Sequence, residues 1–564
     1  MFVTKEEAKS FGVWKQVVFG AVVICLCVYR IYSLPVGNGL FVNSDLLILP
    51  AFYDDLLRGL GYGTGWHFGA AHFYFPDFAA FAALRFLTGN FRFAIALMGV
   101  VLPIAFFVIS RAVYVEMGGQ NGWTYTLLLT AGYVALVAYG VRRATGLFWE
   151  FYASSLAMGV HFGAYLTALL CLLLYLTYSR TGHRSVLIWS LVTMVAAIIS
   201  DLWFVIYFSV PVLALSLFIL LTSRDGKSRQ ATFLLTAAAV TVGSFLVYYR
   251  ITPATGDYTS GVSLAKSLES ATILIGDVGH APMADPLFVG LFLLAPLAYV
   301  LAYLLIFGVR SIQRGRIDPP RSWRGGDAHL AGRAAEMDIL IVYTGASLLA
   351  TLAFVLTFHL YSGVATVRYL HPFVYSPPLC ALIALGLAFE RRQLSWVREG
   401  RWAVASVVAA SALWVAFSRP GIVLTRIFPA PDYVACFNGV GPAAGIAEYW
   451  QAKPLIMYSD HKLQVAGVVG NGGTFVWDDN AYWYVDSWVN PGHPPRYSFI
   501  FMKRLDPTDI TNLYGKPDRV VSCADSEIWF YRQPNNLYAR LVNGNTELLN
   551  DAALLQHPTS QGDP

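Results

Sequence analysis

The chain has 564 residues, of which 56% are hydrophobic, 15% aromatic and only 13% charged. This composition excludes an ordinary soluble protein, and the net charge of +5 does not indicate a nucleic-acid partner. Apolar runs of about 18 residues or more recur along the chain, and they predict an α-helical polytopic membrane protein.

About eleven apolar segments are predicted to cross the membrane. The predicted spans are 16–34, 92–113, 122–140, 161–178, 186–200, 203–222, 231–249, 287–307, 338–358, 370–389 and 402–418. They predict a transmembrane domain over residues 1–418, with a long first extracytoplasmic loop at 35–91. A polar tail over 419–564 forms a second domain.

Clusters of lysine and arginine mark the loops that stay in the cytoplasm. They lie at 5–15, 180–184, 224–229, 310–333 and 391–401, and they occupy alternate loops. The N-terminus is therefore predicted to be cytoplasmic, and the tail lies on the other side. The sequence has no Asn-x-Ser/Thr glycosylation site, which favours a bacterial inner (plasma) membrane and a periplasmic tail.

The first loop places acids soon after the first span, in NSDLLILPAFYDD (Asn43 to Asp55). Its apolar side predicts a helix that lies along the membrane, and HFYFPDFAAFAALRF predicts a second one with Asp77 in its first turn. Asp45 is the best candidate for a catalytic acid that takes a proton from a hydroxyl or binds a divalent cation. The alternative is that Asn43, Ser44 or Asp45 only caps the helix.

Other ionisable residues of the first loop are further candidates for substrate binding. They are Asp54, Asp55, His72 and Asp77. His67 and His72 are five residues apart, a spacing that does not place two metal ligands on one helical face, although His72 with Asp45 stays open as a metal site. A divalent metal is thus allowed, but no cofactor is required.

A second group of ionisable residues follows the third span, in VRRATGLFWEFYASSLAMGVHFG. It contains Arg142, Arg143, Glu150 and His161 in a mainly apolar, extracytoplasmic region. Ionisable groups at membrane depth are costly, so they are candidates for function. Glu150 is predicted as a second acid and the arginines as phosphate ligands; the alternative is that both arginines extend to the membrane surface. Asp201, at another extracytoplasmic span end, is one more candidate.

The stretch VATVRYLHPF places Arg368 at the mouth of a late span, with Tyr369 and His371 beside it. A guanidinium at head-group depth binds a phosphate with two parallel hydrogen bonds. The alternative is an interfacial Arg/Tyr anchor, which many membrane proteins have.

The tail is predicted to be a small α/β domain. KPLIMYSD and YSFIFMKRL are typical of strands, GPAAGIAEYWQAK is typical of a helix, and DPTDITNLYGKPDRVVSCADSEIWFYRQ predicts a helix followed by two strands. Cys436 and Cys523 are the two cysteines of this domain, and an oxidising compartment favours a disulfide between them. The alternative is two buried free thiols.

These residues resemble the GT-C-fold glycosyltransferases, the superfamily of protein O-mannosyltransferases and the lipid A aminoarabinose transferase. Asp45 after the first span, FPDFAAFAALRFLTGN before the second span, and RYLHP at a late span carry the resemblance, which covers roughly residues 10–390. The family often has adjacent acids in the first loop. Here Asp45 stands alone, and the adjacent pair Asp54 and Asp55 comes later.

The resemblance implies transfer of a sugar from a polyprenyl-phosphate donor to a cell-envelope glycan, lipid or protein. Membrane lipid is then a further partner of the chain. It implies that Arg368 binds the phosphate, with Arg142 or Arg143, and that Asp45 deprotonates or positions the acceptor hydroxyl. Glu150 would serve the acceptor or a metal.

Two other classes of protein compete with a transferase. A transporter or flippase of lipid-linked saccharides would place ionisable residues near the bilayer midplane, whereas the span interiors here are nearly free of charge. A non-catalytic scaffold would not need the acids and arginines.

Overall fold

The chain divides into two compact units that do not follow its linear order. The helical unit comprises Met1–Leu34, Phe73–Ile251 and Thr259–Val423, and the sheet unit comprises Pro35–His72, Thr252–Tyr258 and Leu424–Pro564. The computed structural model describes residues 5–32, 43–59, 65–69, 71–119, 122–143, 155–222, 227–251, 263–284, 328–391, 400–417, 428–440, 443–532 and 534–543. The first half of the first loop therefore belongs to the same unit as the tail.

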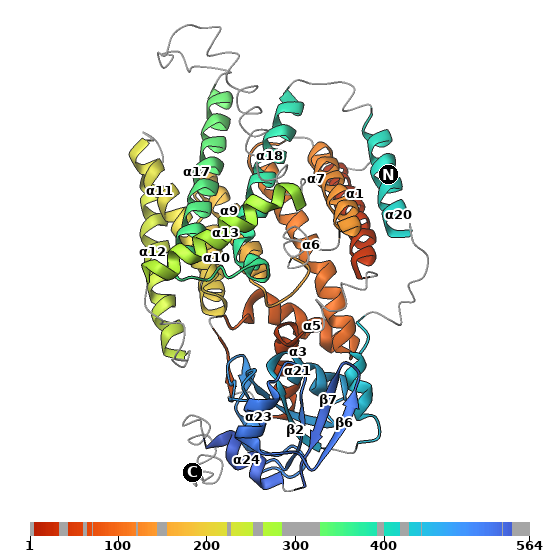
Figure 1. Cartoon of the computed structure of the whole chain (residues 1–564). Helices are drawn as coiled ribbons and strands as arrows, with labels where there is room; N and C mark the ends of the chain where they lie inside the picture. The colour runs from red at the N-terminus through yellow and green to blue at the C-terminus, as the bar shows by residue number, and fades with distance from the viewer. Residues whose placement is uncertain are drawn as a thin grey trace, which may run out of the picture. The chain divides into compact units, whose positions relative to one another are not determined.

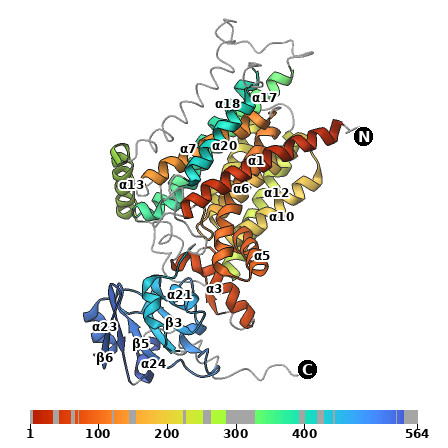
Figure 2. The same ribbon diagram turned by 90° about the vertical axis from the view of Figure 1, so that its right-hand side faces the viewer.

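Long helices build the helical unit, and most of them run side by side in Figures 1 and 2. They are α1 (Lys5–Tyr32), α6 (Phe91–Glu116), α7 (Gly122–Arg143), α9 (Phe162–Thr181), α10 (Arg184–Ser200), α11 (Val210–Thr222), α12 (Lys227–Ile251), α13 (Leu264–Ala284), α17 (Ala328–Thr357), α18 (His371–Arg391) and α20 (Arg401–Phe417). Shorter elements join them, namely η1 (Tyr74–Phe78), α5 (Ala79–Thr88), η2 (Val205–Ser209) and η5 (Val364–Leu370).

Six of the described helices are long and apolar enough to cross a membrane. They contain Val13–Tyr32, Phe91–Glu116, Phe162–Thr181, Ser228–Arg250, Ile339–Thr357 and Arg368–Leu387, and Phe162–Thr181 in α9 is the most deeply buried of them. Large apolar side chains such as Val192, Leu235 and Leu246 are exposed on the helices, which suits contact with lipid. The chain is thus mainly helical, with several helices suited to a membrane.

The predicted spans coincide with helices, apart from 287–307, which lies outside the described residues. The helices at 184–200, 205–221 and 401–417 are apolar but short, and α7 is not among the six long apolar helices. The local hydropathy therefore predicted where the helices lie.

A five-stranded mixed sheet forms the core of the sheet unit, with strand order β3-β2-β5-β7-β6. Its strands are β2 (Ala443–Glu448), β3 (Leu463–Val468), β5 (Tyr497–Phe501), β6 (Arg519–Cys523) and β7 (Ser526–Phe530). β2 pairs in parallel with β3 and β5, whereas β7 runs antiparallel to β5 and β6. The remaining elements are α21 (Tyr449–Tyr458), α22 (Tyr482–Val485), α23 (Pro507–Tyr514), α24 (Pro534–Val542) and a small ladder of β1 (Trp66–His67) with β4 (Asp479–Asn480).

Two predictions for the tail were wrong. AAGIAE within the expected helix forms the strand β2, and KPLIMY within the expected strand lies in the helix α21. β2 is a nearly fully buried strand of a parallel pairing, so its apolar residues do not alternate with polar ones, and periodicity cannot distinguish it from a buried helix. The predicted strand at Tyr497, the helix α23 and the hairpin of β6 and β7 were correct.

The first helix of the first loop, α3 (Ser44–Arg58), belongs to the sheet unit. Asn43 caps it, because its side chain accepts a hydrogen bond from the backbone N–H of Leu46 at 3.0 Å. The helix was predicted to rest on the membrane, but its side chains from Leu46 to Phe52 are buried and it packs on α21. The prediction was wrong because an amphipathic pattern shows that one side of a helix is covered, not what covers it.

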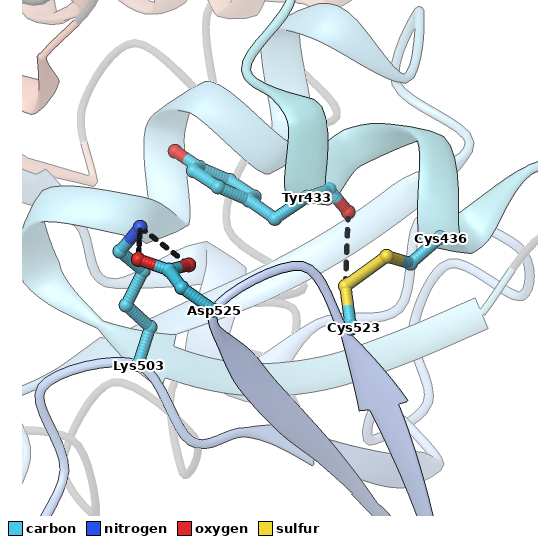
Figure 3. Close-up of a disulfide and its surroundings, with 5 residues drawn as sticks. All are labelled: Tyr433, Cys436, Lys503, Cys523 and Asp525. Atoms are coloured by element: carbon cyan, nitrogen blue, oxygen red, sulfur yellow. Dashed lines mark hydrogen bonds and ion pairs between the residues drawn. A yellow bond between two sulfur atoms is a disulfide. The ribbon is translucent and has the colours of Figure 1, made fainter.

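A disulfide joins Cys436 to Cys523, with their Cα atoms 5.8 Å apart. It ties the short helix η7 (Asp432–Phe437) to the end of β6, and the Sγ of Cys523 lies 3.5 Å from the carbonyl oxygen of Tyr433 (Figure 3). This is the pair that the sequence predicts.

Candidate functional site

The predicted site residues fall into the two units. Asp77, Asp201, Arg368, Tyr369 and His371 lie in the helical unit, whereas Asp45, Asp54, Asp55 and His72 lie in the sheet unit. The side chains of Arg142 and Arg143, at the end of α7, and the whole of Glu150 lie outside the described residues.

A hydrogen bond between a histidine and an aspartate joins two helix ends of the helical unit. His161 precedes α9 and Asp201 follows α10, and Nδ1 of His161 lies 2.8 Å from Oδ2 of Asp201. The second oxygen of Asp201 accepts a hydrogen bond from the backbone N–H of Trp203 at 3.0 Å. Both residues are buried, so the pair is shielded from bulk solvent.

Asp77 lies close to this pair, in the π-helical turn η1. Its Oδ1 accepts a hydrogen bond from the backbone N–H of Gly159 at 3.2 Å. A Cβ on Gly163, in the first turn of α9, would overlap Oδ2 of Asp77, so the carboxyl group lies against the N-terminus of a buried helix. Burial, and then the charge of Asp201, raise the pKa of Asp77 to about 7, although the Gly159 N–H opposes the shift.

Arg368 and Tyr369 come to the same place from η5. The Tyr369 ring stacks on Trp203 with centroids 4.9 Å apart, and its centroid is 5.3 Å from that of His161. The Cζ atom of Arg368 lies 5.5 Å from the centre of the Tyr369 ring. His371 is fully buried, with its ring 5.5 Å from that of Phe162, the residue after His161. Asp77, His161, Asp201, Arg368, Tyr369 and His371 are called the acid–histidine cluster below.

Sequence reasoning noted His161 only as an ionisable residue near the membrane, and it did not consider Trp203. The sequence contains one signal that could have pointed to Trp203. This residue lies only two positions after the candidate Asp201, directly after a predicted span. The pairing of His161 with Asp201 spans 40 residues of sequence, and only the packing of α9 against α10 reveals it.

The acids of α3 make contacts within the sheet unit. Oδ1 of the half-buried Asp45 accepts a hydrogen bond from the Tyr449 hydroxyl at 2.9 Å, and Asp54 pairs with Nε2 of His461 at 2.9 Å. Asn43, and not Asp45, caps α3. The carboxylate of Asp45 instead accepts the hydrogen bond from Tyr449, the first residue of α21.

Asp55 is fully buried and holds α3 to the aromatic part of the sheet unit. Its Oδ2 accepts hydrogen bonds from Trp66 at 3.0 Å, Asn480 at 2.6 Å and Trp483 at 2.9 Å, while Arg58 lies 3.3 Å from Oδ1. Burial raises the pKa of Asp55 to about 6, against the opposing effect of these donors. These contacts favour a structural role over substrate binding.

The described residues contain no group of three or more His, Cys, Asp or Glu side chains that could hold a metal ion. His72 is buried with its ring 5.6 Å from that of Phe68.

The pKa of Asp77 makes stability depend on pH. Because the folded value, about 7, exceeds the ordinary value of 3.8, the folded state binds this proton more tightly than the unfolded state. This contribution is fully present below about pH 4 and is lost as the pH rises to about 7. We expect the unfolding temperature of Asp77→Asn to fall less steeply over this window than that of wild type. Thermal unfolding in detergent at several pH values measures both slopes, and equal slopes would contradict the assignment.

Neither a scan against protein-family models nor a search of the curated proteins finds a match for this chain.

Proposed function

We propose that the protein is a glycosyltransferase of the GT-C type, which moves a sugar from a polyprenyl-phosphate donor to an extracytoplasmic glycan, lipid or protein. The observation that carries the proposal is the acid–histidine cluster. It combines a phosphate-binding type of side chain, Arg368, with buried acids and an imidazole at the ends of helices suited to a membrane. The resemblance of the first loop and of RYLHP to this superfamily supplies the reaction class.

The proposed topology has about eleven spans, including 287–307, in a bacterial inner membrane. The N-terminus is cytoplasmic, and the sheet unit lies in the periplasm. The disulfide Cys436–Cys523 supports this orientation, because disulfides persist in oxidising compartments.

In the proposed reaction, Arg368 binds the phosphate of the donor and stabilises the charge that develops on it as the bond to the sugar breaks. The acceptor oxygen attacks the anomeric carbon, and polyprenyl phosphate leaves. A single displacement inverts the anomeric configuration. Asp45 positions the acceptor hydroxyl. This is one of the two roles that the resemblance implies for Asp45, and deprotonation of the hydroxyl is the other. Phosphate is already a good leaving group, so orientation and charge stabilisation account for most of the catalysis.

The test is the release of polyprenyl phosphate by purified protein from a panel of polyprenyl-phosphate sugars in detergent with lipid. We expect release by wild type. Asp45→Asn should lower it about tenfold to a hundredfold, because a hydrogen bond to a charged group contributes about 1.5–3 kcal/mol. Asp525→Asn is the matched control, since Asp525 is exposed and forms an ion pair with Lys503 in the same unit.

Equal release by wild type and Asp45→Asn would leave the transferase standing and give Asp45 only its structural bond to Tyr449. Absence of release with every donor, together with transport of lipid-linked saccharides into liposomes, would replace the transferase by the flippase.

A further inference from the structure

The hydrogen bond between His161 and Asp201 holds the imidazole ring in one defined orientation. Asp201 is 2% exposed, and its two oxygens are occupied by Nδ1 of His161 and by the backbone N–H of Trp203. A carboxylate in this position accepts a hydrogen bond from Nδ1–H, which leaves a lone pair on Nε2. The pair is thus arranged like a base and the group that orients it.

The second nitrogen of His161 is available for chemistry. In the described part of the chain, Nε2 of His161 makes no hydrogen bond, and the ring is surrounded by the aromatic rings of Phe73, Trp203 and Tyr369. Within these residues, the lone pair on Nε2 of His161 therefore has no hydrogen-bond donor. The hydroxyl group of a bound substrate could donate its proton to this nitrogen.

The backbone around the pair is unusual in two places. His161 has a φ of +67°, which a residue other than glycine seldom adopts and which costs conformational energy. The π-helix η2 begins four residues after Asp201, and π-helical turns often lie at functional sites. The surrounding packing therefore maintains a ring position that the local backbone does not favour.

We propose that His161 is the proton acceptor of the transfer reaction and that Asp201 is its positioning residue. The inference rests on the proposed function. As the acceptor oxygen bonds to the anomeric carbon, its proton moves to Nε2 of His161, and the electron pair of the breaking carbon–oxygen bond leaves with polyprenyl phosphate. Asp201 stabilises the imidazolium that forms. Arg368, which lies against the same Tyr369 ring as His161, stabilises the phosphate.

His161→Asn tests the proton acceptor, because asparagine tolerates a positive φ and keeps an N–H donor for Asp201. We expect kcat for polyprenyl-phosphate release to fall about 100-fold to 10,000-fold, the range for loss of a general base, while KM for the donor stays within about threefold. His161→Gln is the second variant in case the first folds poorly. His183→Gln is the control, since His183 is exposed at the opposite end of α10.

Asp201→Asn tests the positioning residue. If Asp201 acts through His161, its replacement lowers kcat, and the double variant with His161→Asn is no slower than His161→Asn alone. Losses that multiply in the double variant would show that Asp201 only supports the fold.

The outcomes separate the inference from the function on which it rests. Release by wild type that persists within about threefold in both His161 variants overturns the inference and leaves the transferase. Absence of release by wild type overturns the proposed function and the proton-accepting role with it.

Discussion

Replacing Arg368 by glutamine is expected to lower the rate of polyprenyl-phosphate release about 100-fold to 1,000-fold, the loss seen when one group that stabilises transition-state charge is removed. The reason, in the proposed reaction, is the negative charge that grows on the phosphate as the sugar leaves. Arg368 lies over the Tyr369 ring, at the start of a helix suited to a membrane, and a guanidinium can bind a phosphate with two parallel hydrogen bonds. The measurement is single-turnover release from the best donor of the panel.

Two further variants sharpen this prediction. Arg368→Lys keeps the positive charge but loses the two parallel hydrogen bonds, so its rate should lie between those of wild type and Arg368→Gln. Arg180→Gln is the matched control, because Arg180 lies at the far end of α9, with 60% of its side chain exposed, and pairs with Glu116. Comparable losses in Arg180→Gln and Arg368→Gln would mean that positive charge in general, and not a phosphate site, supports the rate.

Replacing Asp55 by alanine is expected to destabilise the sheet unit by several kcal/mol. The change leaves the side-chain donors of Trp66, Asn480 and Trp483 buried without their acceptor, and each such donor costs about 1–3 kcal/mol. The unfolding temperature should fall on the order of 10 °C. Thermal unfolding of the full chain in detergent, followed by tryptophan fluorescence, measures the loss.

Asp54→Ala is the matched control for Asp55→Ala, since it removes a neighbouring carboxylate of the same helix that has a histidine partner at 2.9 Å and is partly exposed. It should cost much less, because a partly exposed pair contributes little. If both variants lose the same stability, Asp55 is not the residue that holds α3 in place. Unchanged stability of Asp55→Ala would exclude the structural role altogether.

The helices were predictable from the sequence because hydropathy is a local quantity. The transfer of each apolar side chain out of water adds to the same sum, and a run of about 20 residues is long enough to show it. α6 and α9 therefore coincide with predicted spans. The disulfide was predictable for a different reason. Cys436 and Cys523 are the two cysteines of the tail, so the tail offers a single pairing.

The candidate site was predictable only in part. Arg368, Tyr369 and Asp201 were predicted from their place at span ends, and Asp77 was predicted from its place in the first turn of a loop helix. The role of His161 was missed, because a lone histidine before a span has no local signal that distinguishes a base from a packed ring. The role proposed for it depends on a carboxylate 40 residues away.

The sequence by itself determined that the protein is mainly helical, where its apolar helices lie, and which ionisable residues stand at their ends. The tertiary structure decided which of these residues meet. It covered α3 with α21, buried Asp55 among tryptophans, made AAGIAE a strand and joined His161 to Asp201. The physical reason is that hydropathy accumulates along neighbouring residues, whereas a hydrogen bond or an ion pair needs two groups that only packing brings together.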